Sequence, residues 1–244
     1  MEFTCVKHTV ARNLSLLTLL LGGCAGKQPA SRPTTIQPSD DADRDTSEVA
    51  VSAEVGGLNE DATNRVFQHA ERNFLKCFQK RAKKIELLGG DVKFFVVVGQ
   101  DGTARSVNVE QSDLGDRKAE KCMIDTLLRQ SWPKPVGGRT AQAHYTAAPF
   151  ELLDPDVREP AALNSEDLEK VLHKISGKVR ECKGSISARF VATVYVDTDG
   201  KVITASVTSP DPDGEFAIDC LVSVIRAATF PSPGSYPGKG SFEL

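Results

Sequence analysis

Apolar residues recur at helical spacing in two stretches of the chain. In residues 62–78, and again in residues 168–182, they return every three or four positions, which is the spacing of one face of an amphipathic helix. Asn164 precedes the second stretch and carries a side chain suited to a helix N-cap. Cys77 and Cys182 fall on the apolar faces, so each predicted helix buries a cysteine.

Each predicted helix is followed by a run rich in β-branched and aromatic residues, an Asp-Gly turn and a return strand. A second amphipathic helix comes next, a Pro-x-Pro sequence ends it, and a short closing strand completes the unit. We therefore predict an α+β fold of two tandem α-β-β-α-β domains, each with its helices on one face of a small antiparallel sheet. The expected strands are residues 92–98, 107–109 and 144–152 in the first unit, and residues 190–196, 205–207 and 240–244 in the second.

The two units share their landmarks in the same order, which indicates a tandem duplication. Counted from a Leu-Asn pair at 58–59 or 163–164, the twentieth residue is a cysteine in both units; a second cysteine follows the turn aspartate by 21 residues, and each unit closes on Phe-Glu-Leu. One interval differs, because the first unit has seven extra residues between its first cysteine and Asp-Gly. The landmarks are Cys77, Asp101, Gly102, Cys122, Trp132, Pro133 and Phe150 in the first repeat (58–152), and Cys182, Asp199, Gly200, Cys220, Phe230, Pro231 and Phe242 in the second repeat (153–244).

The N-terminal residues 1–23 have the pattern of a lipoprotein signal peptide. A positive start precedes the apolar run of residues 14–21, and Leu-Gly-Gly then leads to Cys24. The run is too short to span a membrane, and its ending resembles the bacterial lipobox, whose cysteine accepts a diacylglyceryl group. An ordinary secretory signal followed by a chance cysteine is the alternative. Ala25 follows Cys24 in place of Asp, which favours an outer-membrane lipoprotein that faces the periplasm.

Residues 24–57 would link this lipid to the repeats. The segment is rich in Pro, Ser, Thr and Asp and contains no aromatic residue. Such a composition cannot bury a core, so we predict a disordered tether.

Cysteine usage supports an oxidising compartment. One of the six cysteines lies in the signal peptide and another takes the lipid, which leaves two in each repeat. Four cysteines allow three pairings, and the duplication favours Cys77–Cys122 and Cys182–Cys220, because each repeat should be self-sufficient. A zinc site is the weaker alternative, because no C-x-x-C pair occurs and no histidine stands at ligand spacing from a cysteine. Free buried thiols are the other alternative.

The order and spacing of the landmarks resemble the TonB C-terminal domain. The paired cysteines make the chain more similar to a related domain, found at the C-terminus of gliding-motility proteins of the AgmX/PglI type. The resemblance covers residues 58–244 and rests on the cysteines, the Asp-Gly turns, the aromatic-Pro pairs and the closing phenylalanines. It also rests on the serine that ends each return strand, Ser112 or Ser209.

The resemblance implies peptide capture without catalysis. In the TonB family a sheet edge accepts a partner strand by β-augmentation. Members of that class carry an inner-membrane helix and a long Pro-rich spacer before one such domain, whereas this chain has a lipobox, a short spacer and two domains, so energy transduction is not expected. Pro149 favours an edge position for the closing strand of the first repeat. The candidate edge residues are Tyr145, Thr146, Ala147 and Phe150.

The expected function is therefore a periplasmic protein-binding scaffold of an envelope complex, such as one for gliding motility or transport. A structural lipoprotein that binds peptidoglycan or another envelope polymer is the alternative. No nucleophile motif, metalloprotease motif or phosphate loop occurs, and the repeats share no histidine. We accordingly expect no enzyme, no metal, no cofactor beyond the lipid on Cys24, and, because the protein is exported, no nucleic-acid partner.

Charge differs between the repeats. The first repeat has 15 basic and 12 acidic residues, a net charge of +3, whereas the second has 10 and 14, a net charge of −4. Five of the basic residues lie close together within residues 76–84, which predicts either a solvated helix end or a surface for an anionic polymer or lipid. The opposite net charges suggest that the repeats dock on each other or meet partners of opposite sign.

Overall fold

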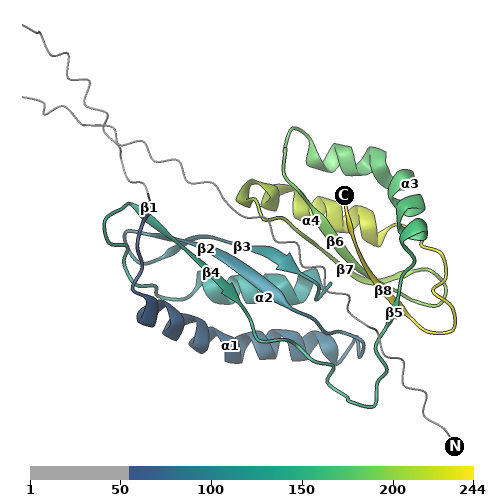
Figure 1. The fold of residues 1–244 in the computed structure, drawn as a ribbon, viewed down its shortest axis with the longest axis horizontal. Helices are drawn as coiled ribbons and strands as arrows, with labels where there is room; N and C mark the ends of the chain where they lie inside the picture. The colour runs from purple at the N-terminus through teal and green to yellow at the C-terminus, as the bar shows by residue number, and fades with distance from the viewer. Residues whose placement is uncertain (1–54) are drawn as a thin grey trace, which may run out of the picture. The chain divides into compact units, whose positions relative to one another are not determined.

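The computed structural model describes residues 55–244, which belong to one compact unit. They form two four-stranded sheets and four α-helices (Figure 1). The signal peptide predicted for residues 1–23, the lipidated Cys24 and the tether as far as residue 54 lie outside the described residues. No helix within residues 55–244 is long and apolar enough to cross a membrane.

The first sheet has the strand order β1-β4-β2-β3, with β2 antiparallel to both β3 and β4 and with β1 parallel to β4. Helices α1 and α2 lie side by side along one face of this sheet (Figure 1). The elements are β1 (Val55–Gly56), α1 (Glu60–Ala82), β2 (Val92–Gly99), β3 (Ala104–Ser112), α2 (Arg117–Leu128) and β4 (Thr140–Thr146).

The second sheet repeats this arrangement with the order β5-β8-β6-β7. Strand β6 again lies between two antiparallel neighbours, and the short β5 is parallel to β8. Its elements are β5 (Ala161–Ala162), α3 (Ser165–Lys183), β6 (Val191–Val196), β7 (Val202–Thr208), the 3₁₀ helix η1 (Pro212–Gly214), α4 (Glu215–Arg226) and β8 (Gly238–Glu243).

The helices begin and bury their faces as their sequences dictate. The side chains of Asn59 and Asn164 cap α1 and α3 by accepting hydrogen bonds of 2.8 Å from the backbone N–H groups of Ala62 and Glu166. The N-cap predicted at Asn164 is therefore confirmed. The apolar stripe of α1 packs on β2, where the rings of Phe74 and Phe94 stack with centroids 5.2 Å apart.

The Asp-Gly turns are held by the aromatic-Pro landmarks. Gly102 and Gly200 have φ angles of 79° and 80°, a left-handed conformation that favours glycine. The backbone N–H of Trp132 donates to the Gly102 carbonyl at 2.8 Å, and that of Phe230 donates to Gly200 at 2.9 Å. A Cβ atom at Gly200 would lie only 2.0 Å from the carbonyl oxygen of Phe230. The turn and the end of the second helix are therefore fixed to each other.

The structure corrects two expectations about the sheets. The closing strand of the first repeat is Thr140–Thr146, not residues 144–152, and Phe150 forms only an isolated bridge with Gly90. The sheets are mixed because β1 and β5 add parallel pairs. These two-residue strands are too short to show a sequence period, and β1 lies within the segment expected to be a tether.

Candidate binding edge and the contact between the repeats

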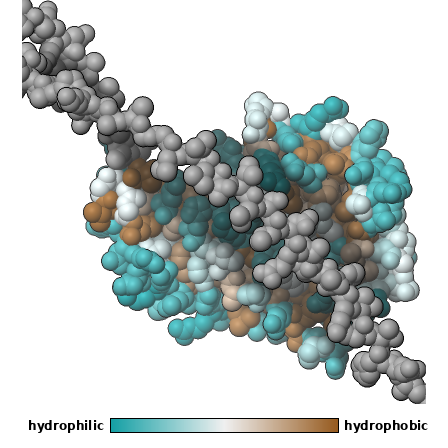
Figure 2. All heavy atoms as spheres, in the orientation of Figure 1, coloured by the Kyte–Doolittle hydropathy of each residue, from teal (hydrophilic) through white to brown (hydrophobic). Residues whose placement is uncertain are grey.

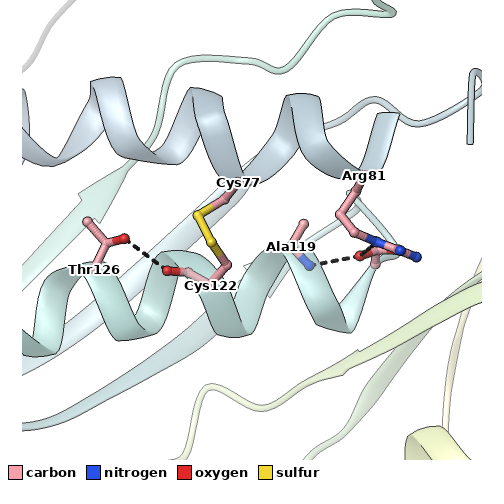
Figure 3. The surroundings of a disulfide bond; sticks show 6 residues. Cys77, Arg81, Ala119, Cys122 and Thr126 are labelled. Atoms are coloured by element: carbon pink, nitrogen blue, oxygen red, sulfur yellow. Dashed lines mark hydrogen bonds and ion pairs between the residues drawn. A yellow bond between two sulfur atoms is a disulfide. The ribbon is translucent and has the colours of Figure 1, made fainter. Parts of the chain in front are cut away.

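Both predicted disulfides are present. Cys77–Cys122 joins α1 to α2, as Figure 3 shows, and Cys182–Cys220 joins α3 to α4. The bonds span sequence separations of 45 and 38 residues, for which the chain-entropy model gives about 4 kcal/mol of stabilisation each. Each disulfide thus ties the two helices of one repeat together above its sheet.

The aromatic residues before proline are part of the cores. Trp132 and Phe230 are only 5% and 4% exposed, and the indole N–H of Trp132 donates to the carbonyl of Leu127 at 3.2 Å. Pro133 and Pro231 follow them, after α2 and α4 have ended at Leu128 and Arg226. Trp132 and Phe230 therefore serve core packing.

Strand β4 has an open edge. Its parallel partner β1 pairs with Thr140 and Ala141, and no strand within residues 55–244 pairs with the outer side of residues 143–146. The N–H of Ala147 donates to the Val92 carbonyl at 2.9 Å. Backbone groups alternate in direction along a strand, so residues 142, 144 and 146 direct their N–H and C=O groups away from β2.

The four predicted edge residues therefore divide into two groups. Thr146 lies on the open edge, with an exposed side chain. Tyr145 faces the helices, where its ring stacks on Phe67 with centroids 4.1 Å apart and its hydroxyl donates to Glu71. Burial and the Glu71 carboxylate raise the pKa of Tyr145. Ala147 and Phe150 are buried, so they support the edge from the core.

A shallow apolar groove lies beside the end of β4. It has a volume of about 290 Å³, and among its large apolar side chains Leu75 is exposed, at 47%. The groove lies between the middle of α1, which carries Glu71, and the segment after β4. Its lining residues are Glu71, Arg72, Phe74, Leu75, Ala147, Ala148, Pro149 and Phe150.

The two repeats meet at a buried ion pair. Asp116, the N-cap of α2, is fully buried and accepts hydrogen bonds from Arg81 at 2.8–3.1 Å and from the Ala119 N–H at 2.8 Å (Figure 3). The hydroxyl of Thr204, on β7 of the second repeat, donates to the same carboxylate at 2.8 Å. Burial raises the pKa of Asp116, but these hydrogen bonds outweigh it and hold the pKa below its usual value.

Further ion pairs join α2 to α4. Arg117 donates to Glu215 at 2.6 Å and to Asp219 at 2.9 Å, and Lys121 also contacts Asp219 at 2.9 Å. Arg117 is largely buried. The cations come from the basic repeat and the anions from the acidic one, which matches the charge difference seen in the sequence.

Glu120 is a fully buried carboxyl group beside this contact. Its Oε1 accepts from the Ser112 hydroxyl at 2.7 Å, while Oε2 and the Ser206 hydroxyl of the second repeat have no hydrogen-bond partner among residues 55–244. Burial raises the pKa of Glu120 to about 7, although the hydrogen bond from Ser112 opposes the shift. The carboxyl group is thus poised to change charge near neutral pH.

The contact between the repeats is asymmetric, because a side chain of the second repeat enters the core of the first. Tyr195 of β6 is fully buried within the hydrophobic core of the first repeat, and its hydroxyl donates to the Gly89 carbonyl at 3.0 Å. The hydroxyl of Thr193 donates to Ser112 at 3.3 Å. No residue of the first repeat belongs to the described core of the second repeat. The second sheet therefore packs its outer face against the first repeat, and β3 of the first sheet takes part in this contact, because the side-chain amide of Asn108 donates to the Ser209 carbonyl at 3.4 Å.

Sequence reasoning missed the residues that make this contact. Asp116, Glu120 and Tyr195 sit at helix-start, helix and strand positions that carry no short motif. The departure from repeat symmetry was the available signal, because Tyr195 stands where the first repeat has Val97. Within residues 55–244, no cluster of three His, Cys, Asp or Glu residues is placed to hold a metal ion.

No protein-family model, curated protein or solved structure matches this chain.

Proposed function

We propose that this protein is a non-catalytic scaffold, anchored as an outer-membrane lipoprotein facing the periplasm, that captures an envelope partner by β-augmentation at the open edge of β4. We also propose that each repeat is a TonB C-terminal-like domain of the AgmX/PglI type. The envelope complex would be one for gliding motility or transport, as the resemblance implies. The observation that carries the proposal is the unpaired outer side of residues 143–146.

The open edge supplies backbone hydrogen bonds in a regular array. His144 and Thr146 each offer an outward N–H and an outward C=O group, and Gln142 adds an outward C=O group, because its N–H faces Gly56 of β1; this array suits a short partner strand. The rest of the strand is held firmly, because β2 pairs with β4 from Thr140 through Thr146. A partner strand would therefore bind to a pre-formed template and would not need to order it.

The flanking side chains indicate the chemistry of the partner strand. On the helix side, the groove containing Leu75 and Pro149 suits an apolar side chain. On the opposite face, His144 lies 3.0 Å from the Glu110 carboxylate, which suits polar side chains. Alternating side chains reach opposite faces of a strand, so the expected partner is an extended segment that alternates apolar and polar residues.

Substitution of proline at the edge tests the proposal. Thr146→Pro removes one outward N–H but leaves the N–H of Ala147, which bonds to β2, in place. Thr146→Val keeps the N–H and is the matched control. The protein is cross-linked in its own envelope and recovered, and its partners are identified by mass spectrometry. We expect Thr146→Pro to lose a partner that both the wild type and Thr146→Val recover.

Equal recovery by all three proteins would contradict binding at this edge. Glu243→Pro makes the corresponding change in β8, because Glu243 pairs with Val191 as Thr146 pairs with Lys93. Loss of the partner with this variant alone would move the site to the second repeat. Co-sedimentation of the wild type with purified sacculi, unaffected by either proline, would favour the alternative of a peptidoglycan-binding structural lipoprotein.

A further inference from the structure

A basic groove runs between α1 and α2 on the outer side of the first disulfide. It has a volume of about 340 Å³, near the lower limit for small-ligand sites. The disulfide forms part of its wall, as the position of Cys77 and Cys122 between the helices in Figure 3 illustrates. The lining residues are Asn73, Lys76, Cys77, Lys80, Cys122, Thr126, Arg129 and Gln130.

The groove contains three cations and no carboxylate. Lys76, Lys80 and Arg129 are exposed, and within residues 55–244 no acidic group forms an ion pair with any of them. Arg81, the next basic residue along α1, is instead engaged by Asp116. Figure 2 shows hydrophilic residues over much of the α1 side of the first repeat.

Two uncharged polar side chains of the groove, those of Thr126 and Gln130, already form hydrogen bonds with the backbone of α2. The Thr126 hydroxyl donates to the Cys122 carbonyl at 2.9 Å, and the side-chain amide of Gln130 donates to the Thr126 carbonyl at 3.1 Å. Both groups therefore satisfy the backbone of α2. The remaining donors of the groove are Lys76, Lys80, Arg129 and the side-chain amide of Asn73. Such a cationic set of donors favours an anionic ligand.

This arrangement carries a cost that scaffold packing does not require. Lys76 and Lys80 are four residues apart on one helix, a spacing at which like charges destabilise a helix. Arg129 adds a third positive charge from across the groove. A bound anion would convert this repulsion into attraction, and phosphate groups are the anions that such sets of lysine and arginine bind most readily.

The second repeat shows that the scaffold itself does not demand the charges. Counting from the paired cysteines, its residues at the places of Lys76, Lys80 and Arg129 are Glu181, Ser185 and Ala227. The disulfide and the two helices are retained there without the basic groove. The charges are therefore a specific property of the first repeat.

We propose that the groove over Cys77–Cys122 binds a phosphate-bearing anion, through Lys76, Lys80 and Arg129. The ligand is a phosphate ester or polyphosphate group with at least one full negative charge, either on a lipid headgroup or free in solution. This site lies on the helices and is separate from the β4 edge, so it does not depend on the scaffold function proposed above.

Titration calorimetry of the full-length protein tests the proposal with two probes. Inorganic pyrophosphate represents the free anion, and short-chain dihexanoyl phosphatidylglycerol, used as a monomer, represents the lipid headgroup. We expect at least one probe to bind, and we expect Lys76→Gln/Lys80→Gln/Arg129→Gln to weaken its affinity at least tenfold. Binding of pyrophosphate alone supports a free phosphate ligand, whereas binding of the lipid supports a headgroup.

A matched control separates the groove from overall charge. Lys174→Gln/Lys178→Gln/Arg226→Gln also removes three exposed cations, including a lysine pair four residues apart, but does so on α3 and α4. This variant should change affinity less than twofold. Lys76→Arg/Lys80→Arg keeps the charge and should retain binding, which guards against a folding defect in the neutralised variant. Failure of both probes to bind the wild type, or equal weakening by the control, would overturn the proposal.

Discussion

The sheet face opposite the helices differs between the two repeats. In the first repeat, Phe95 lies on this face beside the ring of His144, with centroids 5.0 Å apart. In the second repeat, the same face carries Thr193, Tyr195 and Thr204, which are buried and bonded to groups of the first repeat. An amphipathic sheet normally exposes such polar residues to water. Here they are buried because the neighbouring repeat supplies their hydrogen-bond partners.

This difference teaches that the duplication preserved the scaffold while the surfaces diverged. The cysteines, the Asp-Gly turns and the aromatic-Pro pairs have the same structural role in both repeats. The outer sheet face, the basic groove and the charges at the contact do not. The first repeat thus provides the support on which the second sheet rests.

Removal of the disulfides should have the largest effect. Replacing both cysteines of either pair with alanine is expected to cost about 4 kcal/mol of unfolding free energy, because each bond closes a loop of similar length. Denaturant unfolding followed by circular dichroism measures this cost. If the first repeat supports the second, loss of Cys77–Cys122 should make both repeats unfold more readily. Loss of Cys182–Cys220 should leave the first repeat folded.

Limited proteolysis reports which repeat opens in each variant. Cleavage confined to the first repeat after loss of Cys77–Cys122 would show that the second repeat stands alone. In that case the first repeat would not be the support of the second.

Disruption of the buried ion pair should have a smaller effect. Asp116→Ala leaves Arg81 without its carboxylate and removes the cap of α2, for which we expect a loss of about 3 kcal/mol. Asp116→Asn keeps a capping side chain and should recover about 1 kcal/mol of that loss. Thr204→Val, which removes one hydrogen bond from the second repeat, should cost about 1 kcal/mol.

A double-mutant cycle with Asp116→Ala and Thr204→Val locates the coupling. A non-zero interaction energy is expected, because the two side chains share one hydrogen bond across the contact. Strict additivity would show that the repeats are not held together at this point in solution.

The scaffold could be predicted from the sequence because its signals are local and repeated. Apolar spacing located the helices, and the duplicated cysteines indicated their own pairing. The edge at Thr146 was also within reach, although the strand begins at Thr140, where small and polar residues give little β signal. The contact between the repeats was not predictable, because Asp116 and Glu120 acquire their roles only when β7 packs over them. Burial by a distant strand leaves no pattern in the neighbouring sequence.

The pH dependence of stability should be the smallest of the three effects. The pKa of Glu120 is about 7 in the folded protein, against an ordinary value of 4.5, so the folded state binds this proton more tightly than the unfolded state. The resulting stabilisation is complete below about pH 4.5 and is lost as the pH rises through 7. Between pH 5 and pH 8 the protein should lose roughly 2 kcal/mol of unfolding free energy from this group.

Glu120→Gln should remove this dependence, because the amide is neutral at every pH. The variant should match the wild type near pH 5 and exceed its stability by roughly 2 kcal/mol at pH 8, as measured by urea unfolding. Glu166→Gln, an exposed change in the first turn of α3, is the control and should follow the wild-type curve. The neighbouring charges of Asp116 and Arg117 are retained in both variants, so they contribute equally. An unchanged slope in Glu120→Gln would mean that Glu120 stays ionised in the folded protein, and that water or a shift of β7 reaches its carboxylate. In that case the contact between the repeats would be looser than the burial of Tyr195 indicates.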